Sequence, residues 1–394
     1  MNVGLYDRWL ATLGGGERYS LSIAEYLSRE HSVTVLSHTP VDAIQAGERL
    51  GLDLGRVNFV RLDPRPLDQM PVVTADYDFF INASHWDYFP SLARRSAMVV
   101  FFPLRPLDFG ARMRYRLGHL LMGDRLAPLT RPLAARLAPG LAARLENLIP
   151  PDFLDSVASY GLLWSISEFV QEWTYFYWNR ESDLLYPPVD VDAFQPAAKE
   201  RRILSVGRFF HGAHNKKHDV MIRSFREMVD EGLEGWSLHL AGGTQPETVH
   251  QRYLDKLKRM ARGYPITLHT DMPRDDLIRL YETSAIYWHA AGHGEDEART
   301  PHALEHFGIT TVEAMAAGCV PVVYGSGGQP ELVEDGRTGF LWYTSADLMG
   351  RTRRLIADEA LRAQMAAAAV QASRRFDQAH FEVRLRASLA EHGL

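Results

Sequence analysis

The sequence predicts an α/β fold with two doubly wound domains, and three features carry this prediction. At 394 residues the chain exceeds one ordinary hydrophobic core and suggests two domains of about 200 residues each. Residues 2–37 have the pattern of a strand, a glycine-rich turn, an amphipathic helix and a second strand. Another strand and helix begin at RRILSVGRFF, after a proline-containing stretch at 190–196 that is typical of an interdomain linker.

Strands and helices are expected to alternate along both halves. The first helix has apolar side chains on one face: Leu21, Ile23, Ala24 and Leu27. The segments DFFINASHW and AMVVFFPLRP are typical of buried parallel strands that end in polar or proline-rich loops, where ligands gather in open α/β sheets. Later, WSLHLAGG indicates a strand with a glycine turn, and PITLHTDMPRDDLIRLYETSAIYWHAA alternates strand, helix and strand.

Composition is that of a globular protein, with 46% hydrophobic and 23% charged residues. A net charge of −6 argues against a general nucleic-acid binder. The single cysteine, Cys319, lies in an apolar run and is expected to be buried, which leaves no disulfide framework. Apolar runs fall short of the roughly 18 residues of a membrane span, and Met1 leads directly into a strand. We therefore expect a cytoplasmic location.

Two glycine-containing segments are candidate ligand sites. Gly14, Gly15 and Gly16 precede the first helix, where free amides can receive a phosphate, although tight strand-to-helix packing also explains such a turn. In EHFGITTVEAMAAG, Thr310 or Thr311 is the expected helix N-cap and Glu313 the acidic residue of the first turn. Capping-box spacing alone would also explain this Thr-x-x-Glu pattern.

EHFGITTVEAMAAG, followed by PVVYGSGGQPELVEDGRTGFL, resembles the donor-site signature of retaining family 4 glycosyltransferases of the GT-B fold. The resemblance implies two Rossmann-like domains across a cleft. Residues 1–195, completed by a final helix at 376–394, would form the acceptor-side domain, and 196–375 the domain that binds the nucleotide sugar. The donor is a substrate in this family, so no cofactor and no metal are implied.

The same resemblance assigns roles to individual residues. Glu305 would lie beside the donor sugar and Glu313 would bond the nucleotide ribose. Arg208 and Lys216 would clamp the donor diphosphate, with Lys217 as the less favoured lysine by spacing. Backbone amides would hold the donor: those of Gly14, Gly15 and Gly16 at the diphosphate and those of Phe307, Gly308, Ile309 and Thr310 at the sugar hydroxyls. The loop 269–273 would meet the nucleobase.

One departure from the family pattern concerns a histidine near the reacting carbon. Many relatives have it before a Phe-Pro pair, where this chain has Phe101. His85, at the end of the preceding strand, is a candidate replacement, but a packing role is an equally simple interpretation. The acidic loop that contains His293, Glu295, Asp296 and Glu297 is interpreted as solvated rather than as a metal site.

Residues 111–148 carry seven Arg and only two acidic residues among many Leu and Ala. Ordinary surface helices explain this composition, and so does a basic amphipathic surface that rests on anionic lipid at the inner face of a membrane. The resemblance predicts a retaining transfer of a sugar from GDP-mannose or a UDP-sugar to a glycan or lipid-linked hydroxyl. A nucleotide-sugar epimerase and a catalytically silent sugar-nucleotide binder are the alternatives.

Overall fold

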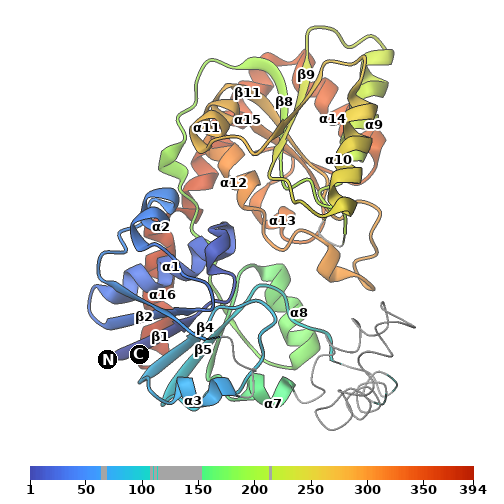
Figure 1. The fold of residues 1–394 in the computed structure, drawn as a ribbon. Coiled ribbons are helices and arrows are strands. Elements are labelled where there is room, and N and C mark those ends of the chain that lie inside the picture. Colours follow the sequence, from blue (N-terminus) through green and yellow to red (C-terminus); the bar gives the residue numbers. More distant parts are fainter. Residues whose placement is uncertain (64–68, 107–109, 111–112, 114–152, 213–214) are drawn as a thin grey trace.

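The chain forms two α/β lobes joined side by side (Figure 1). The computed structural model describes residues 1–63, 69–106, 110, 113, 153–212 and 215–394. The basic segment predicted at 111–148 therefore lies outside the described residues, apart from Met113.

The first lobe contains a seven-stranded parallel sheet in the order β3-β2-β1-β4-β5-β6-β7. Its strands are β1 (Asn2–Tyr6), β2 (Ser32–Ser37), β3 (Val57–Arg61), β4 (Phe79–Asn82), β5 (Arg95–Val100), β6 (Leu162–Ser165) and β7 (Asp183–Leu184). Its helices are α1 (Gly15–Ser28), α2 (Ala43–Leu50), α3 (Met70–Thr74), α7 (Phe153–Ala158) and α8 (Glu168–Trp178). The order reverses between β1 and β4, which pair directly through Tyr6 and Asn82.

The second lobe contains a six-stranded parallel sheet in the order β10-β9-β8-β11-β12-β13. Its strands are β8 (Glu200–Val206), β9 (Ser237–Gly242), β10 (Ile266–Thr270), β11 (Ser284–His289), β12 (Val320–Tyr324) and β13 (Phe340–Trp342). Its helices are α9 (His218–Asp230), α10 (Thr248–Ala261), α11 (Arg274–Thr283), α12 (Ile309–Ala316), α13 (Gln329–Leu332), α14 (Ser345–Ala357) and α15 (Glu359–Ser373). Here the order reverses between β8 and β11.

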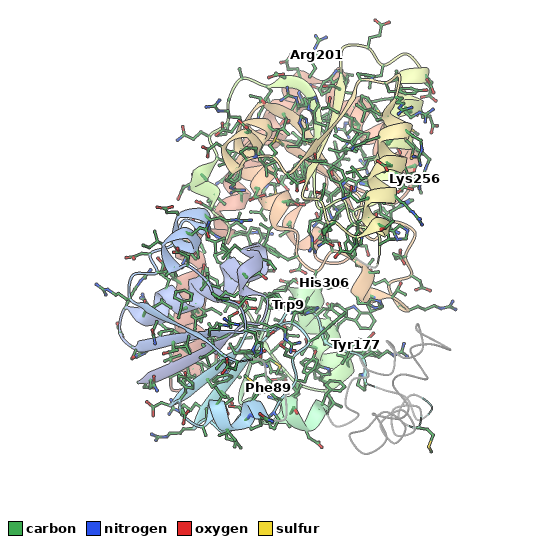
Figure 2. The ribbon with its side chains drawn as sticks, viewed as in Figure 1. Trp9, Phe89, Tyr177, Arg201, Lys256 and His306 are labelled. Carbon is green, nitrogen blue, oxygen red and sulfur yellow. The ribbon has the colours of Figure 1, made fainter. Side chains whose placement is uncertain are left out.

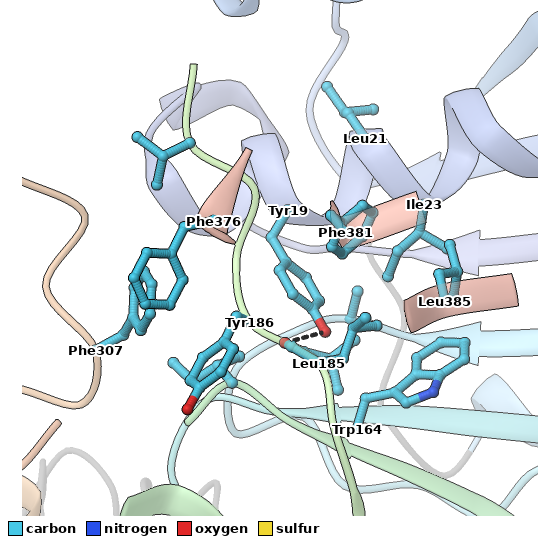
Figure 3. Packing of buried hydrophobic residues seen from close by; sticks show 14 of the residues in the cluster. Tyr19, Leu21, Ile23, Trp164, Leu185, Tyr186, Phe307, Phe376, Phe381 and Leu385 are labelled. Atoms are coloured by element: carbon cyan, nitrogen blue, oxygen red, sulfur yellow. Dashed lines mark hydrogen bonds between the residues drawn. The ribbon is translucent and has the colours of Figure 1, made fainter. Parts of the chain in front are cut away.

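Helix α1 shows how the sequence pattern produces the first core. Leu21, Ile23, Ala24 and Leu27 are buried, as their spacing predicts. Tyr19 is fully buried as well, and its hydroxyl donates to the Leu185 carbonyl oxygen at 3.2 Å (Figure 3). This bond satisfies a polar group that would otherwise be buried without a partner.

The last helix, α16 (Gln378–Glu391), returns from the second lobe and packs on the first (Figure 1). Its Phe381 ring lies 5.6 Å from that of Tyr19, edge to face, and its Ser388 hydroxyl accepts from the Trp164 indole at 2.8 Å. Two chain crossings, at 190–196 and before α16, therefore connect the lobes.

Aromatic and polar contacts fix the lobes against one another. Phe307 of the second lobe is buried against Tyr186 and Phe376, with ring centroids 5.7 and 5.3 Å away (Figure 3). The Glu331 carboxylate accepts from the first two amides of α8, both at 2.8 Å. A carboxylate is favourable there because those amides have no partner within the helix.

Candidate functional site

The carboxyl ends of β8 and β11 form the point at which the strand order of the second sheet reverses. Open α/β sheets bind ligands at such a switch point, because the loops from the two strands diverge there. Arg208 follows β8, His289 ends β11, and Glu305 lies in the connection from β11 to α12. Lys216 comes to the same place from the loop before α9: a Cβ atom on Gly207 would lie 2.6 Å from its Cγ.

Lys216, Glu305 and His289 form one connected cluster. The Lys216 ammonium lies 2.5 Å from Glu305 Oε2, and His289 Nε2 lies 2.9 Å from the same oxygen. Burial alone would raise the pKa of the Glu305 carboxyl, but Lys216 and His289 outweigh burial and hold this pKa well below its usual range. Burial also lowers the pKa of His289, with Lys216 acting in the same direction. Glu305 is thus an ionised carboxylate that two neighbouring side chains hold in position at the switch point.

The two neighbouring lysines point to different partners. Lys217 has a left-handed backbone, with φ 54°, at the N-cap of α9, and its ammonium pairs with Glu295 at 2.6 Å. Lys216 instead reaches Glu305, the residue that the family pattern places beside the sugar. The geometry therefore favours Lys216 over Lys217 as the site lysine, as the spacing predicted.

Arg208 is exposed at the end of β8, and its guanidinium carbon lies 5.9 Å from the centre of the Phe210 ring. Among the residues that the structure describes, no carboxylate forms an ion pair with it. A guanidinium with no carboxylate partner among the described residues is suited to bind a phosphate group.

The start of α12 differs from the prediction. Gly308 is the N-cap, with φ 113°, and neither Thr310 nor Thr311 caps the helix through its side chain. A Cβ at Gly308 would lie 2.1 Å from the Gln329 amide nitrogen, which donates to the Phe307 carbonyl oxygen at 3.0 Å. The positive φ and the close Gln329 side chain both favour glycine at position 308, and the expected N-cap at Thr310 or Thr311 is wrong.

The threonines have other partners. The Thr310 hydroxyl accepts from Tyr287 at 2.8 Å, and the Thr311 hydroxyl donates to Gln329 Oε1 at 2.9 Å. Free amides remain at the helix start because the first turn of any helix lacks internal acceptors. The N-terminal end of α12 is consequently an anion- or hydroxyl-binding end next to Glu305.

Glu313 lies in the second turn of α12, not in the first, and is 8% exposed. One carboxylate oxygen accepts from Arg274 at 2.9 Å and the other from the Tyr281 hydroxyl at 2.9 Å. Each oxygen has a second lone pair, so the carboxylate can still accept a hydroxyl. The two donors fix its orientation.

The glycine turn of the first lobe faces this end of α12. A Cβ on Gly15 would lie 2.3 Å from Ile309 Cδ1, so a larger residue there would force the Ile309 side chain to move. Helix α1 begins at Gly15, so Gly15 and Gly16 form its first turn instead of a loop before it. The Gly14 amide already donates to Glu17 Oε2 at 2.7 Å, so an anion would have to replace that carboxylate there.

His85 lies beside Phe101, the residue that stands in place of the family histidine. The two rings meet edge to face with centroids 6.0 Å apart, and Phe101 is 3.6 Å from a Cβ placed on Gly16. His85 is thus near the glycine turn, and its participation in the reaction stays a prediction.

The acidic loop after β11 has separate partners for its side chains. Glu295 pairs with Lys217, Asp296 with Arg299, and Glu297 accepts from the Ser326 hydroxyl. Across the described ranges, no group of three or more His, Cys, Asp or Glu is arranged to hold a metal ion. In the same part of the chain, every helix is too short or too polar to cross a bilayer.

Sequence reasoning missed three residues that build the site: His289, Arg274 and Tyr281. Only His289 had a usable signal, because it is a polar residue at the carboxyl end of a buried strand. Arg274 and Tyr281 act through Glu313 from helix α11, which is separated from it by about thirty residues of chain. Nothing in their local pattern indicates that pairing.

Two facing doubly wound lobes, with the site at the switch point of the second, define the GT-B architecture. Solved structures share it over 99% of this chain. Anabaena HepE in complex with UDP aligns with a TM-score of 0.69 at 16% identity, over 100% of its own chain. WaaG, a glycosyltransferase involved in lipopolysaccharide biosynthesis, aligns with a TM-score of 0.62 at 14% identity, over 99% of its chain. At these identities the likeness shows the fold alone, and it confirms the predicted fold class.

Sequence relatives define the second lobe further. Residues 190–372 match the family described as "Glycosyl transferases group 1", so the coarser part of the resemblance is confirmed there. The chain is 27% identical over 196 residues to the GDP-Man:Man(3)GlcNAc(2)-PP-Dol alpha-1,2-mannosyltransferase of Xenopus laevis. That alignment covers 45% of this chain and 36% of the relative.

The human protein of the same name is 27% identical over 254 residues, which is 57% of this chain and 48% of the relative. The alignments thus span less than half the length of these curated relatives.

Proposed function

We propose that this protein is a retaining hexosyltransferase that moves a sugar from a nucleotide diphosphate donor to a hydroxyl of a glycan or lipid-linked acceptor. The observation that carries the proposal is the pairing of Lys216 with Glu305 at the second switch point, in the connection that leads to the N-terminal end of α12. The glycine turn of the first lobe lies opposite that end. The group 1 match and the named activities of the relatives support it.

The charges of the site fit the chemistry of this reaction. When the bond between the sugar and the diphosphate breaks, negative charge grows on the departing phosphate oxygens. Arg208 and the amides of Gly15 and Gly16 would stabilise that charge. Lys216 would form a bridge between the phosphate and Glu305, while Glu305 accepts sugar hydroxyls through its remaining lone pairs.

Retention would follow from attack on the same face that the phosphate leaves. In that arrangement the departing phosphate oxygen takes the proton of the acceptor hydroxyl. We propose the backbone of Phe307, Gly308, Ile309 and Thr310 for the sugar hydroxyls and Glu313 for the ribose, oriented by Arg274 and Tyr281. The relatives' names make GDP-mannose the first donor to test, followed by UDP-sugars.

A thermal-shift screen against UDP, GDP, ADP and their sugar conjugates tests the donor class directly. A ligand present at 100 times its dissociation constant adds about 2.7 kcal/mol to the free energy of unfolding, which is easily measured. Stabilisation by one nucleotide family is expected, and none by any nucleotide would refute the proposal.

Two further measurements separate the alternatives: NMR of the product, and an assay of donor turnover in the absence of an acceptor. NMR of the product anomeric proton distinguishes retention from inversion. An epimerase would convert the donor and release a free sugar product without an acceptor. A catalytically silent binder would be stabilised by nucleotide but would leave the donor unchanged.

A further inference from the structure

The first lobe has a switch point of its own, between β1 and β4, and two indoles lie in the loops that follow these strands. Trp9 follows β1 and is 51% exposed, while Trp86 follows β4 and is 52% exposed. Figure 2 places Trp9 on the side of the first lobe that faces the second, near the level of His306. Ligands gather at such points in open sheets, so half-exposed aromatic rings there are candidate binding surfaces.

Hydrogen bonds hold the two loops together as one unit. The Arg8 amide donates to the Ser84 hydroxyl at 3.3 Å, and the Arg8 guanidinium pairs with the Asp87 carboxylate at 3.0 Å. Ser84 in turn donates to Asp87 at 2.9 Å, and the Trp9 amide donates to Asp7 at 3.0 Å. Both indoles are therefore carried by a braced pair of loops, which makes their positions defined without a ligand.

Trp86 has a backbone that is unfavourable for its residue type. Its φ is 66°, in the left-handed region, where a bulky side chain is costly. Its ring stacks on His85, with centroids 4.6 Å apart and planes at 26°, and His85 contacts Phe101 near the glycine turn. Because a strained backbone holds this large apolar ring partly in solvent, we interpret the exposed Trp86 ring as a ligand-binding surface.

The polar groups around the indoles match a neutral ligand better than an ion. The Arg8 charge is balanced by Asp87, whose second oxygen also accepts from the Tyr6 hydroxyl at 3.0 Å. The ammonium and guanidinium groups proposed to hold the donor diphosphate lie on the other lobe. A partly exposed guanidinium next in sequence to a half-exposed indole provides donors and apolar surface together, which suits a ring with hydroxyls on its rim and C–H groups on its faces.

We propose that Trp9 and Trp86, with Arg8, form the subsite that binds a neutral pyranose unit of the acceptor. This inference rests on the proposed transferase function, and it commits the acceptor end that enters the site to a carbohydrate. The indoles would stack on the sugar, and the remaining N–H groups of Arg8 would donate to its hydroxyls, while the buried Asp87 holds Arg8 in place. Trp9 and Trp86 are thereby specificity residues and take no part in the bond-breaking step.

The test uses the full chain and two neutral probes, mannotriose and chitotriose, with binding followed by saturation-transfer NMR and titration calorimetry. The variants are Trp9→Ala and Trp86→Gly, the second chosen because glycine adopts a positive φ without strain. Tyr343→Ala is the matched control, because Tyr343 is 59% exposed but lies in the second lobe.

The wild-type protein should bind at least one trisaccharide. Each tryptophan variant should weaken that binding about tenfold, equivalent to about 1.4 kcal/mol, and the control should not. Nucleotide stabilisation and the rate of donor hydrolysis should stay within about twofold of wild type in all three variants.

The outcomes separate this subsite from the donor site. If the wild-type protein bound none of the nucleotides, the proposed function itself would be refuted. Normal nucleotide binding with unchanged trisaccharide affinity in both tryptophan variants would refute the subsite alone. If the wild-type protein binds nucleotide but neither trisaccharide, the carbohydrate assignment is wrong, and a protein or lipid surface would have to occupy the indoles.

Discussion

Substituting each of the two adjacent lysines, Lys216 and Lys217, in turn tests the catalytic assignment most directly. Lys216→Met removes the ammonium next to Glu305 while keeping an unbranched apolar stem. Lys217→Gly removes the neighbouring ammonium and places glycine at φ 54°, a backbone that glycine adopts freely. The two variants change the same charge one residue apart, so each is the control for the other.

The structure predicts unequal effects of the two substitutions on stability. The Lys216 and Glu305 side chains are 23% and 14% exposed, so removal of the lysine leaves a largely buried carboxylate with only His289 as partner. Breaking a fully buried pair costs roughly 3 to 5 kcal/mol, and the residual exposure here reduces our expectation to about 2 kcal/mol. For a domain of this size that lowers Tm by about 4 to 8 °C.

Lys217→Gly loses a pair with Glu295, which is 31% exposed, and such pairs contribute about 0 to 1 kcal/mol. Relief of the left-handed backbone offsets that loss by a similar amount. The Tm of this variant should therefore stay close to that of the wild-type protein.

Kinetics give the second, independent readout. Lys216 is proposed to face phosphate oxygens whose charge rises in the transition state. Lys216→Met should therefore lower kcat by about 100-fold, whereas Lys217→Gly should leave kcat within about threefold. The assay is nucleotide release from the sugar donor that stabilises the protein in the thermal-shift screen. Near-normal kcat in Lys216→Met together with a large loss in Lys217→Gly would reverse the assignment.

Four further predictions follow from the geometry. Arg208→Ala should lower kcat by about 100-fold with little change in Tm, because the exposed guanidinium stabilises only a charged ligand. Glu313→Ala should act mainly on the donor KM, by about 1.5 to 3 kcal/mol, with a loss of Tm because the buried Tyr281 hydroxyl and the half-exposed Arg274 lose their acceptor. Glu305 has a pKa below that of the unfolded chain, so its stabilising effect should be complete above about pH 4.3 and disappear as the pH falls through the folded pKa. The Tm gap between wild type and Glu305→Gln should accordingly narrow below about pH 4. If 111–148 is a lipid-facing basic surface, vesicle sedimentation should require anionic lipid and weaken with salt, since each nearby Arg contributes about 1 kcal/mol.

Each of these predictions has a clear contrary result. An unchanged kcat in Arg208→Ala would remove that residue from the catalytic set. A Glu313→Ala variant with lower kcat at saturating donor would move Glu313 from ribose binding to the reaction itself. A Tm gap that is constant from pH 7 to about 3 would show that Glu305 has an ordinary pKa in the fold. Equal sedimentation with neutral and anionic vesicles would favour an acceptor in solution.

Local sequence patterns were sufficient to predict the fold class and the positions of the site residues in the chain. Alternating apolar strands and amphipathic helices determine two parallel sheets, because buried strands and one-sided helices have few other ways to pack. Polar residues and glycines directly after strands then fall at the carboxyl edge of each sheet. Arg208 and Glu305 were assigned through the resemblance to the glycosyltransferase family, and their roles stay predictions.

Tertiary structure alone decided which of these groups meet. Lys216 and Lys217 have identical side chains, and their sequence does not say which carboxylate each ammonium group reaches. In the structure Lys216 pairs with Glu305, whereas Lys217, which has a left-handed backbone, pairs with Glu295. Helix α12 begins at Ile309, after a Gly308 whose φ is positive and whose side is occupied by Gln329, a residue about twenty positions further along the chain. Such pairings depend on contacts between segments that are far apart in sequence, and residue spacing carries no information about which distant side chain fills a given space.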